Sequence, residues 1–192
     1  MIPVRPGAAQ RARYTAGIVA AYRAASPDQR ARGRAWYTTA HELALMLADG
    51  NAAKGAGVIA ALSANKSWAD NKRLAADAIA GNPHGTFADA LRKAAAIMAG
   101  ADPAMVLPMD RKTGHFYRCI VNPADPDAVV IDRHAHDIAV GEVYGNRNRG
   151  LSCPARYAVL AHCYREAGLI LGELPSTGQA SVWTAHIERT RS

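Results

Sequence analysis

Apolar residues recur every three or four positions through most of the chain, and glycine or proline interrupts this pattern at intervals. Such spacing is typical of amphipathic helices, which bury one face against their neighbours. Polar residues suited to capping stand where many of the apolar stretches begin. The pattern predicts an all-α protein of about nine to ten helices, with at most a trivial amount of strand.

Three capping boxes mark helix starts, at Ser26–Gln29, Ser67–Asp70 and Thr86–Asp89. Each places a hydroxyl at the N-cap and a Gln or Asp three positions later, where the two can satisfy each other's backbone N–H groups. Glycines mark the helix ends, because glycine is favoured directly after a helix C-terminus. On this rule the helix that starts at Pro154 should stop at Gly168.

The length of 192 residues and a hydrophobic content of 49% suit one domain covering residues 1–192. The formal net charge is +7 and the sequence pI is about 9.6. A basic balance of this size is compatible with a polyanionic partner such as DNA, although ordinary solubilising charge would give the same balance. The basic segment 145–150 is expected to be a flexible loop that is either simply solvated or in contact with phosphate.

The cysteines are three in number and widely spaced, which favours a reducing compartment without a disulfide framework. No metal-ligand spacing is found among the cysteines and histidines, so no metal site is expected. No apolar segment approaches the length of a membrane span, and no signal peptide is recognised. We expect a cytoplasmic monomer with no membrane association.

Lys112 and Asp132 are the candidates for catalytic chemistry. Lys112 lies in a polar turn that opens a predicted helix, and Asp132 follows the apolar stretch Ala128–Ile131 at the start of the next one. An amine and a carboxylate at two helix starts can meet in a cleft as a nucleophile and an acid or base. A surface lysine and a helix N-cap would account for the same residues, so this alternative stays open.

The segments around both residues resemble the active-site region of helix-hairpin-helix DNA glycosylases of the endonuclease III type. That family has Leu-Pro-Gly-Val-Gly-x-Lys-Thr-Ala, then a helix, then an apolar stretch ending in Val-Asp-x-His; this chain has LPMDRKTG and VVIDRH. The resemblance assigns the catalytic lysine to Lys112 and the catalytic aspartate to Asp132. Two features depart from the family: the loop Asn122–Asp127 accommodates two extra residues, and Met109–Arg111 replaces glycines that bring backbone N–H groups close to a DNA phosphate.

A second match lies at Leu62–Ala64 and, after a polar turn, at Asn71 and Lys72. The resemblance implies that Asn65 fills the gap left in the duplex by an extruded base, flanked by Lys66 and Trp68. A structural role is equally open, in which Asn65 ends a helix and Trp68 packs on the core.

The resemblance also implies a fold. It implies a recognisable core at about residues 52–138, with helical flanks at 1–51 and 139–192 forming a second subdomain, so that two subdomains border a cleft. Many members of the family hold an iron–sulfur cluster on four closely spaced cysteines near the C-terminus. Three scattered cysteines cannot build that cluster, and no cofactor is expected.

The implied activity is that of a DNA glycosylase, with or without strand-nicking lyase chemistry, acting on a flipped-out modified or damaged pyrimidine. The cations Arg111, Arg118 and Arg133 should lower the pKa of Lys112 and so favour the nucleophilic amine. Asp132 would stabilise developing positive charge or act as a general base. The further candidates for DNA or base contact are Trp36, Tyr37, Asn65, Lys66, Trp68, Arg111, His115, Tyr117, Arg133 and His134.

Two other functions remain open. Some bacteriophage enzymes that resemble this glycosylase fold, including the alpha-glutamyl/putrescinyl thymine pyrophosphorylases, attach an amino acid or amine to activated hydroxymethyl pyrimidines in DNA. In such a transferase Lys112 would contact pyrophosphate or the incoming amine. The third alternative is a DNA-binding module without catalysis. For Trp36, Tyr37 and the histidines, core packing is the competing interpretation.

Overall fold

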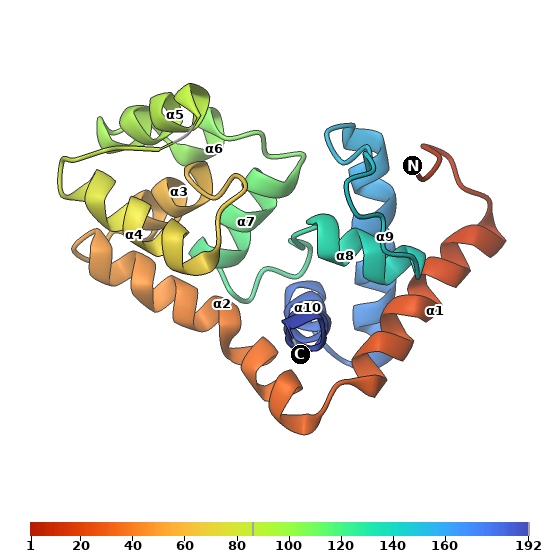
Figure 1. Ribbon diagram of the computed structural model, residues 1–192. Coiled ribbons are helices and arrows are strands. Elements are labelled where there is room, and N and C mark those ends of the chain that lie inside the picture. The colour runs from red at the N-terminus through yellow and green to blue at the C-terminus, as the bar shows by residue number, and fades with distance from the viewer. Residues whose placement is uncertain (86, 192) are drawn as a thin grey trace. The chain divides into compact units, whose positions relative to one another are not determined.

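The computed structural model describes residues 1–85 and 87–191, and this part of the chain forms ten α-helices and no strand. The predicted all-α class is therefore confirmed (Figure 1). Within the same residues, no helix combines the length and the apolar character needed to cross a membrane. The helices are α1 (Ala8–Ala24), α2 (Pro27–Leu47), α3 (Ala52–Ala61), α4 (Trp68–Ile79), α5 (Ala88–Met98), α6 (Pro103–Val106), α7 (Lys112–Val121), α8 (Arg133–Val140), α9 (Pro154–Leu171) and α10 (Pro175–Arg191).

Local capping explains where several helices begin. Ser26 and Gln29 form a reciprocal capping box before α2: the Gln29 N–H donates to Ser26 Oγ at 3.1 Å, and the Ser26 N–H donates to Gln29 Oε1 at 2.8 Å. At α4 the Asp70 N–H donates to Ser67 Oγ at 3.1 Å. The box at Ser26 is confirmed; at Ser67 the N-cap is confirmed, with the Ser67 hydroxyl donating to Asp70 Oδ2 at 2.7 Å, and the third box, at Thr86, lies outside the described residues.

The predicted end of α9 at Gly168 is wrong. The helix continues to Leu171 and ends at Gly172, whose φ of 68° lies in the left-handed region that glycine adopts without strain. Gly168 is buried inside the helix, where a Cβ would lie 2.7 Å from the Glu173 carbonyl oxygen. Glycine is required at 168 for close packing and does not end the helix there.

The chain divides into two compact units. Unit 1 comprises residues 1–37, 110–112 and 124–192, and unit 2 comprises residues 38–109 and 113–123. Unit 2 is thus built mainly from the middle of the chain, and unit 1 mainly from its two ends. Lys112 and Asp132 both belong to unit 1.

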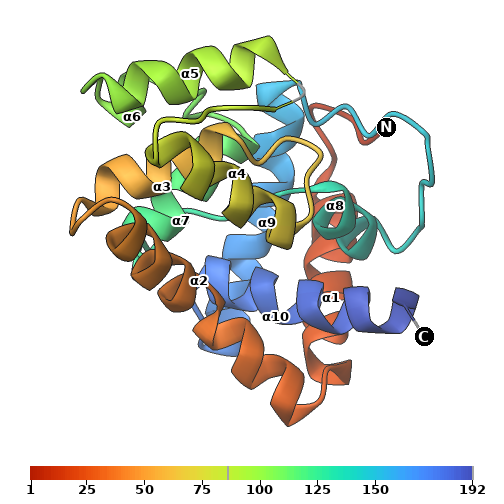
Figure 2. The same cartoon turned by 60° about the vertical axis from the view of Figure 1, so that its left-hand side comes forward.

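The core of unit 1 lies among α1, α8, α9 and α10, with α1 packed along α9 (Figure 2). Its largest fully buried side chains include Tyr157, Tyr164, Ile18 and Leu160. Each such apolar side chain contributes about 1.5–3 kcal/mol when it leaves water. These contacts fix α8, and with it Asp132, within unit 1.

Tyr157 holds the buried stretch Ala128–Ile131, which has no regular secondary structure. The Ile131 N–H donates to Tyr157 Oη at 2.9 Å, and the Tyr157 hydroxyl donates to the Val129 carbonyl oxygen at 2.9 Å. One side chain thereby satisfies backbone groups that a buried segment cannot leave unpaired. The stretch ends directly at Asp132, so Tyr157 also helps to place that carboxylate.

Unit 2 is arranged around α3, which packs against α4, α5 and α6. A Cβ on Gly55 of α3 would lie 2.1 Å from the Ala44 carbonyl oxygen of α2, so only glycine permits this approach. Asn71 of α4 is buried and donates to the Ile59 carbonyl oxygen at 2.9 Å. The small-residue helix α3 therefore serves as the centre of this unit.

Gly33 of α2 permits a similarly close approach in unit 1, because a Cβ there would lie 2.4 Å from Ser181 Cα of α10. We expect Gly33→Ala to lower the free energy of unfolding by about 1–3 kcal/mol through overpacking. Gly178 of α10 is the matched control, since nothing lies within 4 Å of a Cβ there. Gly178→Ala should raise stability by about 0.5–1 kcal/mol. Urea denaturation measures both; a Gly33→Ala protein as stable as the parent would contradict the close approach.

Candidate active site

Lys112 is the first residue of α7 and its side chain is half-buried. Burial lowers the pKa of Lys112, the charge of Asp132 raises it, and the charge of Arg133 lowers it, with a net decrease from the usual 10.5. The predicted direction is confirmed, but burial is the main cause, and Arg133 is the only one of the three predicted arginines that contributes. Within the described residues the amine has no hydrogen-bond or ion-pair partner.

Asp132 is the N-cap of α8, as predicted from the sequence. Its Oδ1 accepts hydrogen bonds from the backbone N–H groups of His134 at 2.9 Å and Ala135 at 2.8 Å. Its Oδ2 accepts a hydrogen bond from Trp183 Nε1 at 3.0 Å. All three donors are neutral, so the carboxylate is held in place without its charge being neutralised by a cation.

Trp183 of α10 connects this carboxylate to an aromatic cluster formed with Trp36 and Tyr37. The Trp183 and Trp36 rings meet edge to face at 6.4 Å between centroids, and Trp36 meets Tyr37 at 4.7 Å. The Tyr37 hydroxyl donates to Gln179 Oε1 at 3.1 Å, one turn before Trp183. The sequence offered only the i, i+4 spacing of Gln179 and Trp183, which does not by itself select Trp183 for a site.

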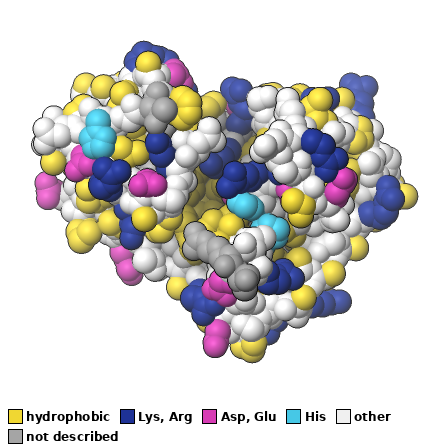
Figure 3. Space-filling view, in the orientation of Figure 1, with side chains coloured by type: hydrophobic (Ala, Val, Ile, Leu, Met, Phe, Trp, Pro, Cys, Tyr) yellow, Lys and Arg dark blue, Asp and Glu magenta, His cyan; other side chains and the backbone are white. Residues whose placement is uncertain are grey.

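His134 lies beside His186 of α10, with 5.2 Å between the ring centroids. Arg133 Nε donates to His134 Nε2 at 3.1 Å. Burial lowers the pKa of both histidines below 6.5, so both rings are neutral near pH 7. Figure 3 shows two adjacent histidine side chains with lysine and arginine side chains nearby, on the part of unit 1 formed by α8 and α10.

Arg111 adjoins Lys112 in unit 1 and is only partly exposed. Its Nε donates to Asp110 Oδ1 at 3.2 Å, and its Nη1 donates to the Ser152 carbonyl oxygen at 3.3 Å. These contacts hold the guanidinium against Asp110 and Ser152, and Arg111 does not contribute to the pKa of Lys112.

The remaining predicted residues belong to unit 2. Asn65 is exposed in the turn after α3 with a φ of 54°, an uncommon conformation for a residue other than glycine. Trp68 is half-buried at the start of α4, edge to face with Phe116 at 6.4 Å and with the Lys72 ammonium 6.0 Å from its ring centroid. Lys66 is also half-buried. The two predicted residues of α7, His115 and Tyr117, are buried, with 7% and 8% of their surface exposed.

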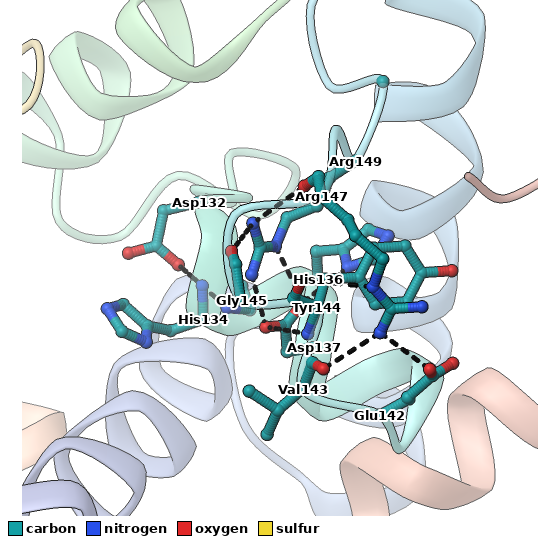
Figure 4. Close-up of polar contacts among 12 residues, drawn as sticks. Asp132, His134, His136, Asp137, Glu142, Val143, Tyr144, Gly145, Arg147 and Arg149 are labelled. Atoms are coloured by element: carbon teal, nitrogen blue, oxygen red, sulfur yellow. Dashed lines mark hydrogen bonds and ion pairs between the residues drawn. The ribbon is translucent and has the colours of Figure 1, made fainter.

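Unit 1 contains a second acidic centre at Asp137, five residues after Asp132 (Figure 4). Its carboxylate accepts hydrogen bonds from Arg149 Nε at 2.8 Å and Nη2 at 2.6 Å, from His136 Nδ1 at 2.8 Å, and from the Tyr144 N–H at 3.1 Å. Burial by itself raises the pKa of Asp137, but donation by Arg149, His136 and Tyr144 outweighs it and brings the pKa to about 2.

This network organises the segment after α8, which the sequence predicted to be a flexible basic loop. The Arg149 side chain is only 12% exposed because it is paired with Asp137. Arg147 lies 4.2 Å from the Tyr144 ring centroid and forms an ion pair with Glu142 at 2.7 Å. Both loop arginines are therefore engaged within the protein.

His136 is fully buried at the centre of the network. Because a carboxylate only accepts hydrogen bonds, the proton of the neutral ring lies on Nδ1, facing Asp137. Its Nε2 has no hydrogen-bond partner among the described residues. Burial keeps the pKa of His136 below 6.5, which is consistent with a neutral ring.

Asp137→Asn should lower the free energy of unfolding near pH 7 by about 2–4 kcal/mol, because it leaves the Arg149 cation buried without its counter-charge. A carboxylate with a depressed pKa stabilises the folded state above its unfolded-state pKa of about 3.9. The difference between parent and variant should therefore shrink as the pH falls from about 4 towards about 2.

Denaturant titrations at several pH values measure this difference. Glu142→Gln is the control, since its ion pair with Arg147 is about half exposed and is expected to contribute less than about 1 kcal/mol. A difference between parent and Asp137→Asn that does not change with pH would contradict the assigned charge state.

The described residues contain no group of three or more His, Cys, Asp or Glu side chains arranged to hold a metal ion, and their cysteines are free thiols. In comparisons with known proteins, no curated protein and no solved structure matches the chain. One protein family does match, over residues 1–191, and its description is "Family of unknown function (DUF7178)". Because the match spans nearly the whole chain, this protein belongs to the DUF7178 family.

Proposed function

We propose that this protein is a DNA base-processing enzyme of the helix-hairpin-helix glycosylase type, with Lys112 as the nucleophile and Asp132 as the charge-stabilising carboxylate. The observation that carries the proposal is the state of Lys112. Its pKa is lowered, its amine has no partner among the described residues, and it lies within the electrostatic influence of Asp132. A lysine must lose its proton before it can attack carbon, and burial favours that loss.

The surroundings of Asp132 support its proposed role as the charge-stabilising carboxylate. Three neutral N–H donors hold the carboxylate, so its negative charge remains available to stabilise positive charge nearby. In contrast, the charge of Asp137 is compensated by Arg149. Of these two carboxylates in unit 1, only Asp132 can supply an uncompensated charge to a reaction at Lys112.

The chemistry follows from this pair. As the bond between C1′ and the base breaks, the base leaves with the electron pair and positive charge develops on the sugar, where Asp132 stabilises it. The Lys112 amine bonds to C1′ and loses a proton, and opening of the sugar ring yields a Schiff base. The neutral aromatic and imidazole groups near Asp132, including Trp36 and His134, would contact the flipped-out base.

The division of the chain also supports the proposal. Unit 2 is formed largely by the middle of the sequence and unit 1 largely by its ends, as the resemblance implies, but Lys112 and Asp132 belong to unit 1 and not to the middle segment. The finer assignment to the helix-hairpin-helix glycosylase fold rests on the motifs around Lys112, Asp132 and Asn65.

A base-modifying transferase is the second candidate, favoured by one observation. Residues 109–111 are Met-Asp-Arg in place of the family's glycines; the charge of Arg133 acts on Lys112, and Arg111 precedes Lys112 in the sequence. Cationic groups such as Lys112 and Arg133 suit a pyrophosphate leaving group better than they suit a neutral base. In this reaction the glycosidic bond would stay intact.

Lys112→Gln should abolish covalent trapping by borohydride on DNA that carries altered pyrimidines, because an amide cannot form a Schiff base. The parent protein should give an adduct of protein plus DNA. Its rate of formation should rise with pH and level off below pH 10.5, since the pKa of Lys112 is lowered from that value. Denaturing gels and intact mass spectrometry detect the adduct.

Lys93→Gln is the matched control, because Lys93 is ion-paired with Asp89 on α5 and belongs to unit 2. It should trap as the parent does. If no base is released and a nucleoside that remains in the DNA changes in mass, the protein is the transferase and not the glycosylase. If neither a released base nor a modified nucleoside is found, and Lys112→Gln still binds DNA, the protein is a binding module.

Asn65→Gly should slow base release from duplex DNA by roughly tenfold or more and leave the rate on single-stranded DNA unchanged, since only a duplex leaves an orphaned partner base to be filled. Glycine adopts the positive φ of this turn without strain, so the fold should be as stable as the parent or slightly more so. Single-turnover assays on both substrates, with thermal unfolding as the stability control, measure the effect. Equal losses on both substrates would argue against a wedge at this position.

A further inference from the structure

We propose that Trp183 is a positioning residue for Asp132: its indole N–H fixes the second carboxylate oxygen and thereby sets the plane of the catalytic carboxylate. This inference rests on the proposed function of Asp132, and it assigns a role that none of the sequence motifs indicates. The observation behind it is the 3.0 Å hydrogen bond from Trp183 Nε1 to Asp132 Oδ2.

The helix cap alone does not fix the carboxylate. Both backbone N–H groups of α8 bind the same oxygen, Oδ1. Rotation about the terminal torsion of an aspartate is soft, because this torsion joins an sp³ and an sp² carbon. The oxygen that the cap leaves free, Oδ2, could therefore move unless a second donor holds it.

Trp183 is suited to this role because it is itself firmly held. Its side chain is half-buried against Trp36. One turn before Trp183, the hydrogen bond from Tyr37 to Gln179 fixes helix α10 to α2. The same helix approaches α2 at Gly33, more closely than a side chain at position 33 would allow. A rigid donor loses little freedom when it holds a carboxylate, so the geometry is preorganised.

The indole group also suits the chemistry. It can only donate a hydrogen bond, and it carries no charge. A lysine or arginine at this place would hold Oδ2 equally well but would neutralise the negative charge that acts on Lys112. Trp183 thus orients Asp132 and preserves its charge.

Trp183→Phe removes the donor and keeps an aromatic ring. We expect the single-turnover rate of base release to fall by roughly tenfold to a hundredfold, with the Kd for DNA unchanged, because a small displacement of a catalytic group affects mainly the chemical step. Tyr164→Phe is the matched control. It removes the hydrogen bond from the Tyr164 hydroxyl to the Ala135 carbonyl oxygen, which also supports α8 but does not hold the Asp132 carboxylate.

Tyr164→Phe should lower the melting temperature at least as much as Trp183→Phe does and retain the parent rate. A purely structural role for Trp183 predicts that the two variants lose rate in proportion to their loss of stability. That result would overturn the inference, and so would a parent rate in Trp183→Phe.

A second measurement tests the contact without any DNA. In ¹⁵N-labelled protein the Trp183 indole N–H gives a cross-peak that Trp183→Phe identifies by its loss. Asp132→Asn should move this peak upfield, since a neutral amide oxygen is a weaker acceptor than a carboxylate. An unmoved peak would overturn the positioning role whatever the activity. A moved peak in a protein that neither releases base nor forms an adduct would instead overturn the proposed function and, with it, the catalytic consequence of the contact.

Discussion

The capping of α8 by Asp132 is the interaction on which the candidate site depends. Two backbone N–H groups at the helix start and one indole N–H bind the same carboxylate. A cap of this kind stabilises a helix by about 0.5–2 kcal/mol. It also fixes a negative charge at a defined place near Lys112. One side chain therefore has a structural role and supplies the electrostatic element of the proposed chemistry.

Asp132, the N-cap of α8, and Asp137, within α8, show how neighbouring carboxylates acquire different properties. Asp137 is surrounded by Arg149, His136 and a backbone N–H, and its charge is compensated within the protein. Asp132 is held by neutral donors alone, so its charge remains uncompensated. Because a charge that is paired with a guanidinium acts weakly on other groups, Asp137 serves to fasten the following loop, and Asp132 can act on Lys112.

Lys112 is the proposed reaction partner of Asp132. Its amine is half-buried at the start of α7, and burial favours the neutral form more strongly than the single neighbouring carboxylate favours the ammonium. A salt bridge with Asp132 would have held the lysine in its charged, unreactive state. The proposed nucleophile therefore needs the charge of Asp132 nearby but no ion pair with it.

The sequence by itself determined the elements whose causes are local. Capping at Ser26, Ser67 and Asp132 depends on residues within three positions, and the helix starts were predictable for that reason. The tertiary structure decided what depends on distant partners. Gly168 continues a helix because the Glu173 carbonyl oxygen lies against it. Trp183 reaches Asp132 from 51 positions away, and the burial that lowers the pKa of Lys112 comes from packing. Such contacts arise from how helices pack in three dimensions, and a local pattern of residues does not specify that packing.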